Sequence, residues 1–73
     1  MLKKYSVTIR GHRTSLTLEP QFWDGLKDIA TRRNQSMAAS ITGVDNKRSE
    51  DENLSSALRL RVLVDLQERL QQT

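Results

Sequence analysis

The step Glu19-Pro20 separates two segments of different periodicity, and it limits the possible folds more than any other feature of the sequence. Before it, apolar and polar residues alternate, which is typical of a strand with one buried face. After it, apolar residues recur at helical spacing: Phe22, Trp23, Leu26, Ile29 and Ala30. Because proline cannot donate to a sheet ladder but suits the first turn of a helix, we expect a helix over about residues 20–33.

Two alternating runs precede this step, and their apolar phases differ. The apolar residues are Tyr5, Val7 and Ile9, then Leu16 and Leu18. One straight strand cannot hold both sets on one face. A hairpin with Gly11-His12 as its loop resolves this, with strands at about residues 5–10 and 13–18. The opposed pairs would be Ile9/Thr14, Val7/Leu16 and Tyr5/Leu18. A bulge at Gly11 in one long strand would also reset the phase.

Polar cap residues indicate two further helices. Asn34 suits the left-handed residue that closes the first helix, and Ser36 can cap a second one over about residues 36–46. Asn53 can cap a third helix over about residues 53–71, whose apolar residues cover too wide an arc for one face. We expect such a helix to be buried on more than one side, which in a short chain favours a subunit interface.

Length and composition indicate a single domain spanning residues 1–73. A chain of 73 residues buries little of its surface, so oligomerisation is expected. It has no cysteine for a disulfide or a thiolate metal site. No apolar run is long enough to span a bilayer, and the N-terminus lacks the apolar core of a signal peptide. We expect a cytoplasmic protein without a membrane partner.

Nothing in the sequence favours an enzyme. His12 is the only histidine and falls in the expected hairpin loop, where a solvated turn residue is commoner than a general base. No Ser-His-acid set and no glycine-rich phosphate loop can be identified. Asp24 and Asp28 most simply belong to the solvated face of a helix. No cofactor and no metal site are expected, since metal binding would need more His, Cys or clustered carboxylates.

Positive charge gathers near the N-terminus. The net charge is +3, yet residues 1–18 carry four cations and no acid, whereas residues 50–52 form an acidic run. This distribution favours a polyanionic partner. In the hairpin with Gly11-His12 as its loop, Arg10 faces Arg13, and like charges directly opposite are unfavourable without a nearby anion. That opposition points to phosphate.

Two places could contact nucleic acid. Arg13, Ser15 and Thr17 project to one side at the two-residue spacing with which a β-ribbon reaches base edges in a major groove. Equally, any half-buried antiparallel strand shows polar residues to water. The other place is the start of the second helix at Ser36, where backbone N–H groups and the helix dipole attract anions.

The segment from Arg13 to Ile41 resembles the ribbon-helix-helix (MetJ/Arc/CopG-type) family. It contains an alternating strand, a helix, a turn at Asn34, a serine at a cap position and a second helix. The resemblance implies a mainly α, intertwined homodimer, in which each chain gives one strand to a short β-ribbon that enters the major groove of double-stranded DNA. The additional N-terminal strand and the third helix lie outside that minimal fold.

Together, the charge pattern and the resemblance assign roles to individual residues. The expected base contacts are Arg13, Ser15 and Thr17. The expected contacts to DNA phosphates are Lys3, Lys4, Arg10, Arg32, Arg33, Ser36 and Met37. The expected dimer core is Leu16, Leu18, Phe22, Trp23, Leu26, Ile29, Ile41, Leu58 and Val62.

The leading interpretation is sequence-specific DNA binding by a homodimeric transcriptional regulator or antitoxin-like repressor. The alternative is an oligomerisation or protein-interaction module without DNA binding, whose protein partner would bind the apolar third helix. The N-terminal strand bears on this choice. If residues 5–10 joined the ribbon, four strands would span roughly 14 Å, which exceeds the groove width of about 12 Å.

Overall fold

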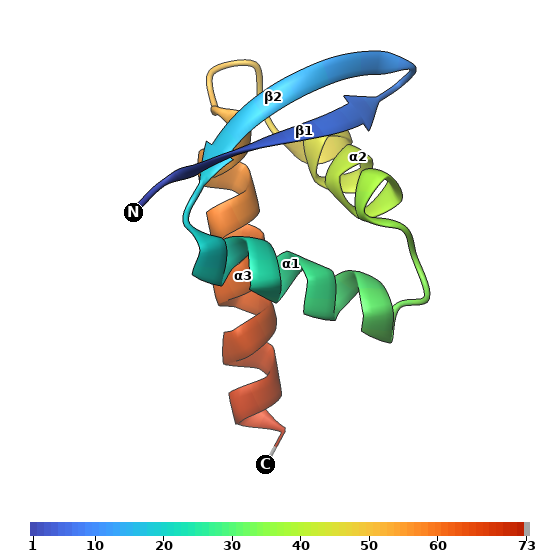
Figure 1. Ribbon diagram of the computed structural model, residues 1–73. Coiled ribbons are helices and arrows are strands. Elements are labelled where there is room, and N and C mark those ends of the chain that lie inside the picture. Colours follow the sequence, from blue (N-terminus) through green and yellow to red (C-terminus); the bar gives the residue numbers. More distant parts are fainter. Residues whose placement is uncertain (73) are drawn as a thin grey trace.

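The computed structural model describes residues 1–72 and consists of an antiparallel hairpin packed on three helices (Figure 1). The elements are β1 (Lys3–Ile9), β2 (His12–Leu18), α1 (Pro20–Arg32), α2 (Met37–Lys47) and α3 (Leu54–Gln71). In Figure 1 the hairpin lies across one end of the molecule, and all three helices lie on the same side of it. The predicted architecture, mainly helical with a short β-ribbon, is confirmed.

The hairpin forms, but its turn lies one residue earlier than predicted. The observed pairs include Ile9/His12, Val7/Thr14 and Tyr5/Leu16, so the predicted pairs Ile9/Thr14, Val7/Leu16 and Tyr5/Leu18 are wrong. The loop residues are Arg10 and Gly11, with φ angles of 53° and 79°. A two-residue type I′ turn needs positive φ at both positions, and glycine occupies the second rather than the first. Because the pairing moved by two residues, the side chains of both strands keep their predicted faces, and only Arg10, now in the turn, does not.

One core lies between the inner face of the hairpin and the three helices. Of the nine residues predicted for a dimer core, six are buried within the single chain: Leu16, Leu18, Leu26, Ile29, Ile41 and Leu58. The other three, Phe22, Trp23 and Val62, are half-buried and pack against them. The rings of Tyr5 and Trp23 stack with centroids 4.0 Å apart, which joins β1 to α1. The chain therefore buries these side chains without a partner.

Helix α3 is buried on one side only. Leu58 is fully buried, whereas Leu60, Leu63, Val64 and Leu66 are between 44% and 51% exposed. The expectation that this helix is buried on more than one side is therefore not met within the chain.

Asn34 closes α1 as predicted. Its φ is 57°, in the left-handed region. Its N–H donates to the carbonyl of Thr31 at 3.1 Å, and the N–H of Gln35 donates to the carbonyl of Ala30 at 2.8 Å. These two bonds form a Schellman motif, which satisfies the last carbonyls of the helix and turns the chain toward α2.

The two predicted N-caps are also present. The Ser36 hydroxyl accepts a hydrogen bond from the Ala39 N–H at 3.0 Å, at the start of α2. The Asn53 side chain accepts from the Ser56 N–H at 2.8 Å, at the start of α3. Each cap satisfies a backbone donor that has no partner inside its helix.

Gly25 allows α1 to pack closely on α3. A Cβ atom at this position would lie 2.7 Å from a methyl carbon of Val62. Glycine inside a helix costs roughly 1 kcal/mol relative to alanine. The close approach of α1 and α3 explains why glycine is present here despite its low helix propensity.

Gly25→Ala is therefore expected to destabilise the fold by about 1–3 kcal/mol through overpacking, despite the better helix propensity of alanine. Because Val62→Ala makes room for the added methyl group, the double variant should be more stable than the sum of the two single effects predicts. Urea unfolding of the wild type, both single variants and the double variant measures this coupling. Strict additivity would contradict the contact.

Candidate nucleic-acid interface

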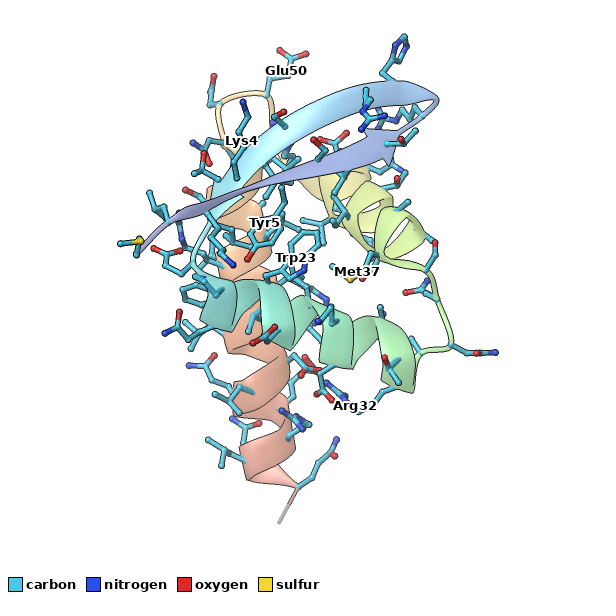
Figure 2. All side chains as sticks on the ribbon, viewed as in Figure 1. Lys4, Tyr5, Trp23, Arg32, Met37 and Glu50 are labelled. Atoms are coloured by element: carbon cyan, nitrogen blue, oxygen red, sulfur yellow. The ribbon has the colours of Figure 1, made fainter. Side chains whose placement is uncertain are left out.

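The outer face of the hairpin is polar along its whole length. Its residues are Lys4, Ser6 and Thr8 on β1 and Arg13, Ser15 and Thr17 on β2. All six are exposed and none is acidic. In Figure 2, Lys4 projects from the side of the hairpin away from the helices, whereas Tyr5 points toward Trp23.

The structure brings the predicted base-contacting residues together on this face. Arg13, Ser15 and Thr17 lie on the outer side of one strand, where Ser6 is paired with Ser15 and Thr8 with Arg13. Ser6 and Thr8 were given no role in the sequence-based assignment, although their alternation with Tyr5, Val7 and Ile9 already placed them on the polar face. The face thus offers four hydroxyl groups beside Arg13 and Lys4.

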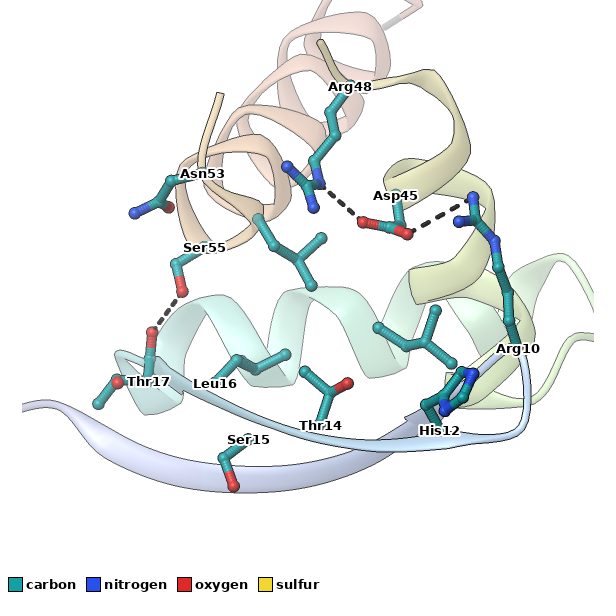
Figure 3. Close-up of a pocket in the computed structure, with 12 residues that line it drawn as sticks. Arg10, His12, Thr14, Ser15, Leu16, Thr17, Asp45, Arg48, Asn53 and Ser55 are labelled. Carbon is teal, nitrogen blue, oxygen red and sulfur yellow. Dashed lines mark hydrogen bonds and ion pairs between the residues drawn. The ribbon is translucent and has the colours of Figure 1, made fainter. Parts of the chain in front are cut away.

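Arg10 does not face Arg13. Its guanidinium donates a hydrogen bond to the side chain of Asn46 and lies 3.6 Å from the Asp45 carboxylate. Asp45 also accepts from Nε of Arg48 at 2.7 Å (Figure 3). The predicted opposition of Arg10 and Arg13, and the argument for phosphate drawn from it, are therefore wrong. These contacts instead tie the hairpin turn to the end of α2.

Arg32 is held between α1 and α3. Its Nε donates to Asp28 at 3.1 Å and its Nη2 to Asp65 at 2.5 Å. The hydrogen bond to Asp65 contributes most to raising the pKa of Arg32. Arg69 lies 3.7 Å from Asp28 and 3.4 Å from Asp65. In Figure 2, Arg32 lies in the helical part of the molecule, well away from the hairpin.

The remaining predicted phosphate contacts are spread over the molecule. Lys3 is exposed at the start of β1, Arg33 is exposed at the end of α1, and Ser36 is exposed at the start of α2. Met37 is half-buried and packs against the core. The structure therefore does not gather these residues with Lys4 and Arg13.

In the described part of the chain, half of the twelve lysines and arginines form ion pairs. These are Arg10, Lys27, Arg32, Arg48, Arg59 and Arg69. Within residues 1–72, the other six have no carboxylate at ion-pair distance: Lys3, Lys4, Arg13, Arg33, Lys47 and Arg61. The first three of these lie on the hairpin, and the last three line one cavity between the helices.

Strand β2 has one edge without a strand partner in the described part of the chain. Ile9 and His12 flank the two-residue loop, so they form a hydrogen-bonded pair and the pattern alternates from there. The backbone N–H and C=O groups of Arg13, Ser15 and Thr17 consequently point away from β1. The Ser55 hydroxyl donates to the Thr17 carbonyl on this edge at 2.8 Å (Figure 3).

A cleft of about 570 Å³ runs along this open edge, between β2, the end of α2 and the start of α3. His12 lines the cleft, as do Thr14 and Leu16, which belong to the inner face of the sheet (Figure 3). Within residues 1–72 no group of three or more His, Cys, Asp or Glu side chains could hold a metal ion. Nor does that part of the chain contain a helix with the length and apolarity to cross a membrane.

A comparison with models of protein families identifies the family of this chain. The model of the family described as "Ribbon-helix-helix domain" matches residues 2–66. The chain belongs to the ribbon-helix-helix family. Members of this family are generally DNA-binding regulators, and ribbon-helix-helix domains are typically not enzymes. Searches of curated proteins and of solved structures found no match. The matched region covers β1 and most of α3, the two elements outside the minimal ribbon-helix-helix unit.

The corner between the ribbon and α1 is fixed by an ion pair with α3. Nε of Arg59 donates to Oε1 of Glu19 at 2.8 Å. This hydrogen bond is the main cause that lowers the pKa of Glu19 below its ordinary value of 4.5. Glu19 directly precedes Pro20, so the contact holds α3 against the end of β2.

The lowered pKa predicts a pH dependence of stability. The stabilisation is fully present above the pKa that Glu19 has in the unfolded chain, and it is lost as the pH falls through the lower pKa of the folded protein. Below pH 4.5 the free energy of unfolding should therefore fall more steeply in the wild type than in Arg59→Gln. Urea unfolding over a pH series measures both slopes, and Arg33→Gln, which removes an unpaired cation, should keep the wild-type slope. Equal slopes in the wild type and Arg59→Gln would rule out this contribution.

Proposed function

We propose that this ribbon-helix-helix protein is a cytoplasmic, homodimeric transcriptional regulator or antitoxin-like repressor that binds double-stranded DNA sequence-specifically. The observation that carries the proposal is the outer face of β2, where Arg13, Ser15 and Thr17 are exposed at two-residue spacing. Within residues 1–72 the Arg13 guanidinium has no carboxylate partner, so it remains available for a base edge or a phosphate. Hydroxyl and guanidinium groups are suited to hydrogen bonding in the major groove.

The open edge of β2 supports a dimer that forms by strand pairing. If Ser15 lies at a two-fold axis, the outward backbone groups of Arg13 and Thr17 of the two chains meet in antiparallel pairs. On the inner face, Thr14 of each chain then lies opposite Leu16 of the other and fills the cleft along this edge. A carbonyl oxygen has two lone pairs, so Thr17 can accept from a partner strand as well as from Ser55.

Charge also supports this pairing. The start of α3 touches the Thr17 end of the open edge through Ser55, and residues 50–52 in the preceding loop are all acidic. In the proposed dimer the partner's hairpin turn, with Arg10 and Arg13 on either side of Gly11, approaches this acidic loop. Opposite charges on the two surfaces would align the chains and suppress other registers.

The proposed dimer has four strands, because β1 pairs with β2 along its whole length. Such a sheet spans roughly 14 Å, against a groove about 12 Å wide. We propose that the two β2 strands face the groove, while each β1 strand lies over a flanking phosphate backbone with Lys3 and Lys4. Arg33 and Ser36 remain proposed phosphate contacts, whereas Arg10 and Arg32, already ion-paired, should contribute less.

A protein-interaction module without DNA binding is the second candidate. The observation that favours it is the exposed apolar surface on α3, which includes Leu60, Leu63, Val64 and Leu66. Contiguous apolar surface of this kind often marks a protein-binding site. Loss of duplex binding on substitution of Arg13 separates the two candidates.

Ser15→Pro is expected to abolish the dimer, because proline removes the N–H that would pair across the open edge of β2. Ser6→Pro is a matched control, since Ser6 is paired with Ser15 and its N–H points outward from the opposite edge. Sedimentation equilibrium should show a monomer for Ser15→Pro and a dimer for Ser6→Pro. Dimers of equal strength in both variants would refute pairing through β2.

Arg13→Ala is expected to weaken duplex binding by about 1–3 kcal/mol and to relax sequence preference, as the loss of a base-contacting arginine does. Lys27→Ala removes the same charge from α1, where Lys27 pairs with Asp24 at 3.8 Å, and should change affinity little. Asp51→Ala should not weaken binding either, because Glu50 and Glu52 keep the loop acidic toward the partner's hairpin turn. Fluorescence anisotropy with a labelled duplex measures the affinities of the three variants. In the same assay, the affinity of the wild type should fall steeply as the salt concentration rises. Equal losses in Arg13→Ala and Lys27→Ala would contradict the proposed DNA-contacting face. No duplex binding by the wild type, or binding without salt dependence, would favour the second candidate.

A further inference from the structure

A small cavity at the junction of the three helices is lined by cations. Its volume is about 180 Å³, and no strand residue contributes to it. Arg33 comes from the end of α1, Lys47 from the end of α2 and Arg61 from α3. Within residues 1–72 none of the three has a carboxylate at ion-pair distance. Gln35 and Ser40 add polar groups to the lining.

Helix dipoles account for only part of this arrangement. Arg33 and Lys47 lie at helix C-termini, where a cation interacts favourably with the dipole. Arg61 lies inside α3 and is half-buried, so no such benefit applies to it. Like charges from three separate elements around one hollow repel one another unless an anion lies between them.

An apolar groove continues from this cavity. The groove has a volume of about 240 Å³ and shares Val44, Lys47 and Arg61 with the cationic cavity. Its apolar lining is completed by Ala57, Leu60 and Val64 of α3. Leu60 is 51% exposed and Val64 is 44% exposed, so apolar surface lies open to water beside the three cations.

We propose that this junction binds a small amphipathic organic anion. Its phosphate or carboxylate head lies between Arg33, Lys47 and Arg61, and its apolar part lies along Val44, Leu60 and Val64. A mostly apolar pocket with a few convergent polar groups is typical of small-molecule sites. The site is separate from the hairpin face with Arg13, Ser15 and Thr17, because no strand residue lines the cavity or the adjoining groove. Arg33 is the one residue of the site that is also proposed as a DNA phosphate contact, so the variants below leave it unchanged.

The first test titrates the full-length, isotope-labelled protein with n-octyl phosphate and with n-octanoate, and follows amide chemical shifts. Saturable shifts in α2 and α3 are expected for at least one of these anions, and comparison of the two identifies the preferred head group. Inorganic phosphate has the anionic head group without an apolar tail, and octyl glucoside has the octyl tail with an uncharged sugar head group. Both should bind at least about tenfold more weakly than the preferred anion. Equal binding of inorganic phosphate, or no saturable binding of either octyl anion, would overturn the proposal.

The second test uses variants of side chains that have no ion pair to lose. The double variant Lys47→Gln with Arg61→Gln, and separately Leu60→Ser, should each weaken the preferred anion about tenfold or more. Arg13→Gln, the matched control on the hairpin, should leave anion binding unchanged. Thermal unfolding checks that each variant is folded. Unchanged anion affinity in the double variant would overturn the proposal that these cations bind the head group. So would a loss of duplex affinity in the double variant as large as that in Arg13→Gln, which would place these cations on the DNA surface.

Discussion

The structure depends on covering the apolar inner face of the hairpin within one chain. Val7, Ile9, Leu16 and Leu18 all lie on that face and are buried. Two strands alone are marginally stable in water, so this face needs a helical layer against it. Leu58 of α3, which is fully buried in the same cluster, helps to complete that layer. The third helix thus provides burial that a shorter strand-helix-helix chain would have to find in a partner.

The position of α3 is tied to the ribbon at two points. The Ser55 hydroxyl bonds to the carbonyl of Thr17, and Arg59 bonds to Glu19 at the corner before α1. Farther along, the carboxylate of Asp65 joins α3 to Arg32 of α1. Paired charges therefore fasten the elements to one another, and the unpaired cations are left on the hairpin and at the helix junction. The outer face of β2 is exposed, whereas Leu16 and Leu18 on its inner face are buried.

Features that depend on neighbouring residues could be predicted from the sequence, whereas contacts between residues far apart in the chain could not. The period change at Pro20 and the caps at Asn34, Ser36 and Asn53 depend on neighbouring residues, so the order of the elements followed from them. The predicted pairing of the two strands was wrong because the turn holds Arg10 at positive φ, a conformation that few residues other than glycine adopt. Likewise, Arg10 and Arg32 looked available for phosphate. Asp28 stands four residues before Arg32, so the helical i,i+4 spacing could have identified that pair. The other partners, Asp45 of Arg10 and Asp65 of Arg32, lie on other elements, and no spacing rule identifies them.

The two edges of the hairpin differ in a way that bears on its assembly. An exposed strand edge invites pairing with another chain, and lysine on the edge is a common protection. Strand β1 carries Lys3 and Lys4 at its start, whereas β2 carries the single cation Arg13 and no lysine. On the β2 edge, the Thr17 carbonyl accepts a hydrogen bond from the Ser55 side chain. The edge with fewer cations is also the edge beside the cleft that Leu16 and Leu54 line, and this asymmetry is the reason why the proposed dimer pairs through β2 rather than β1.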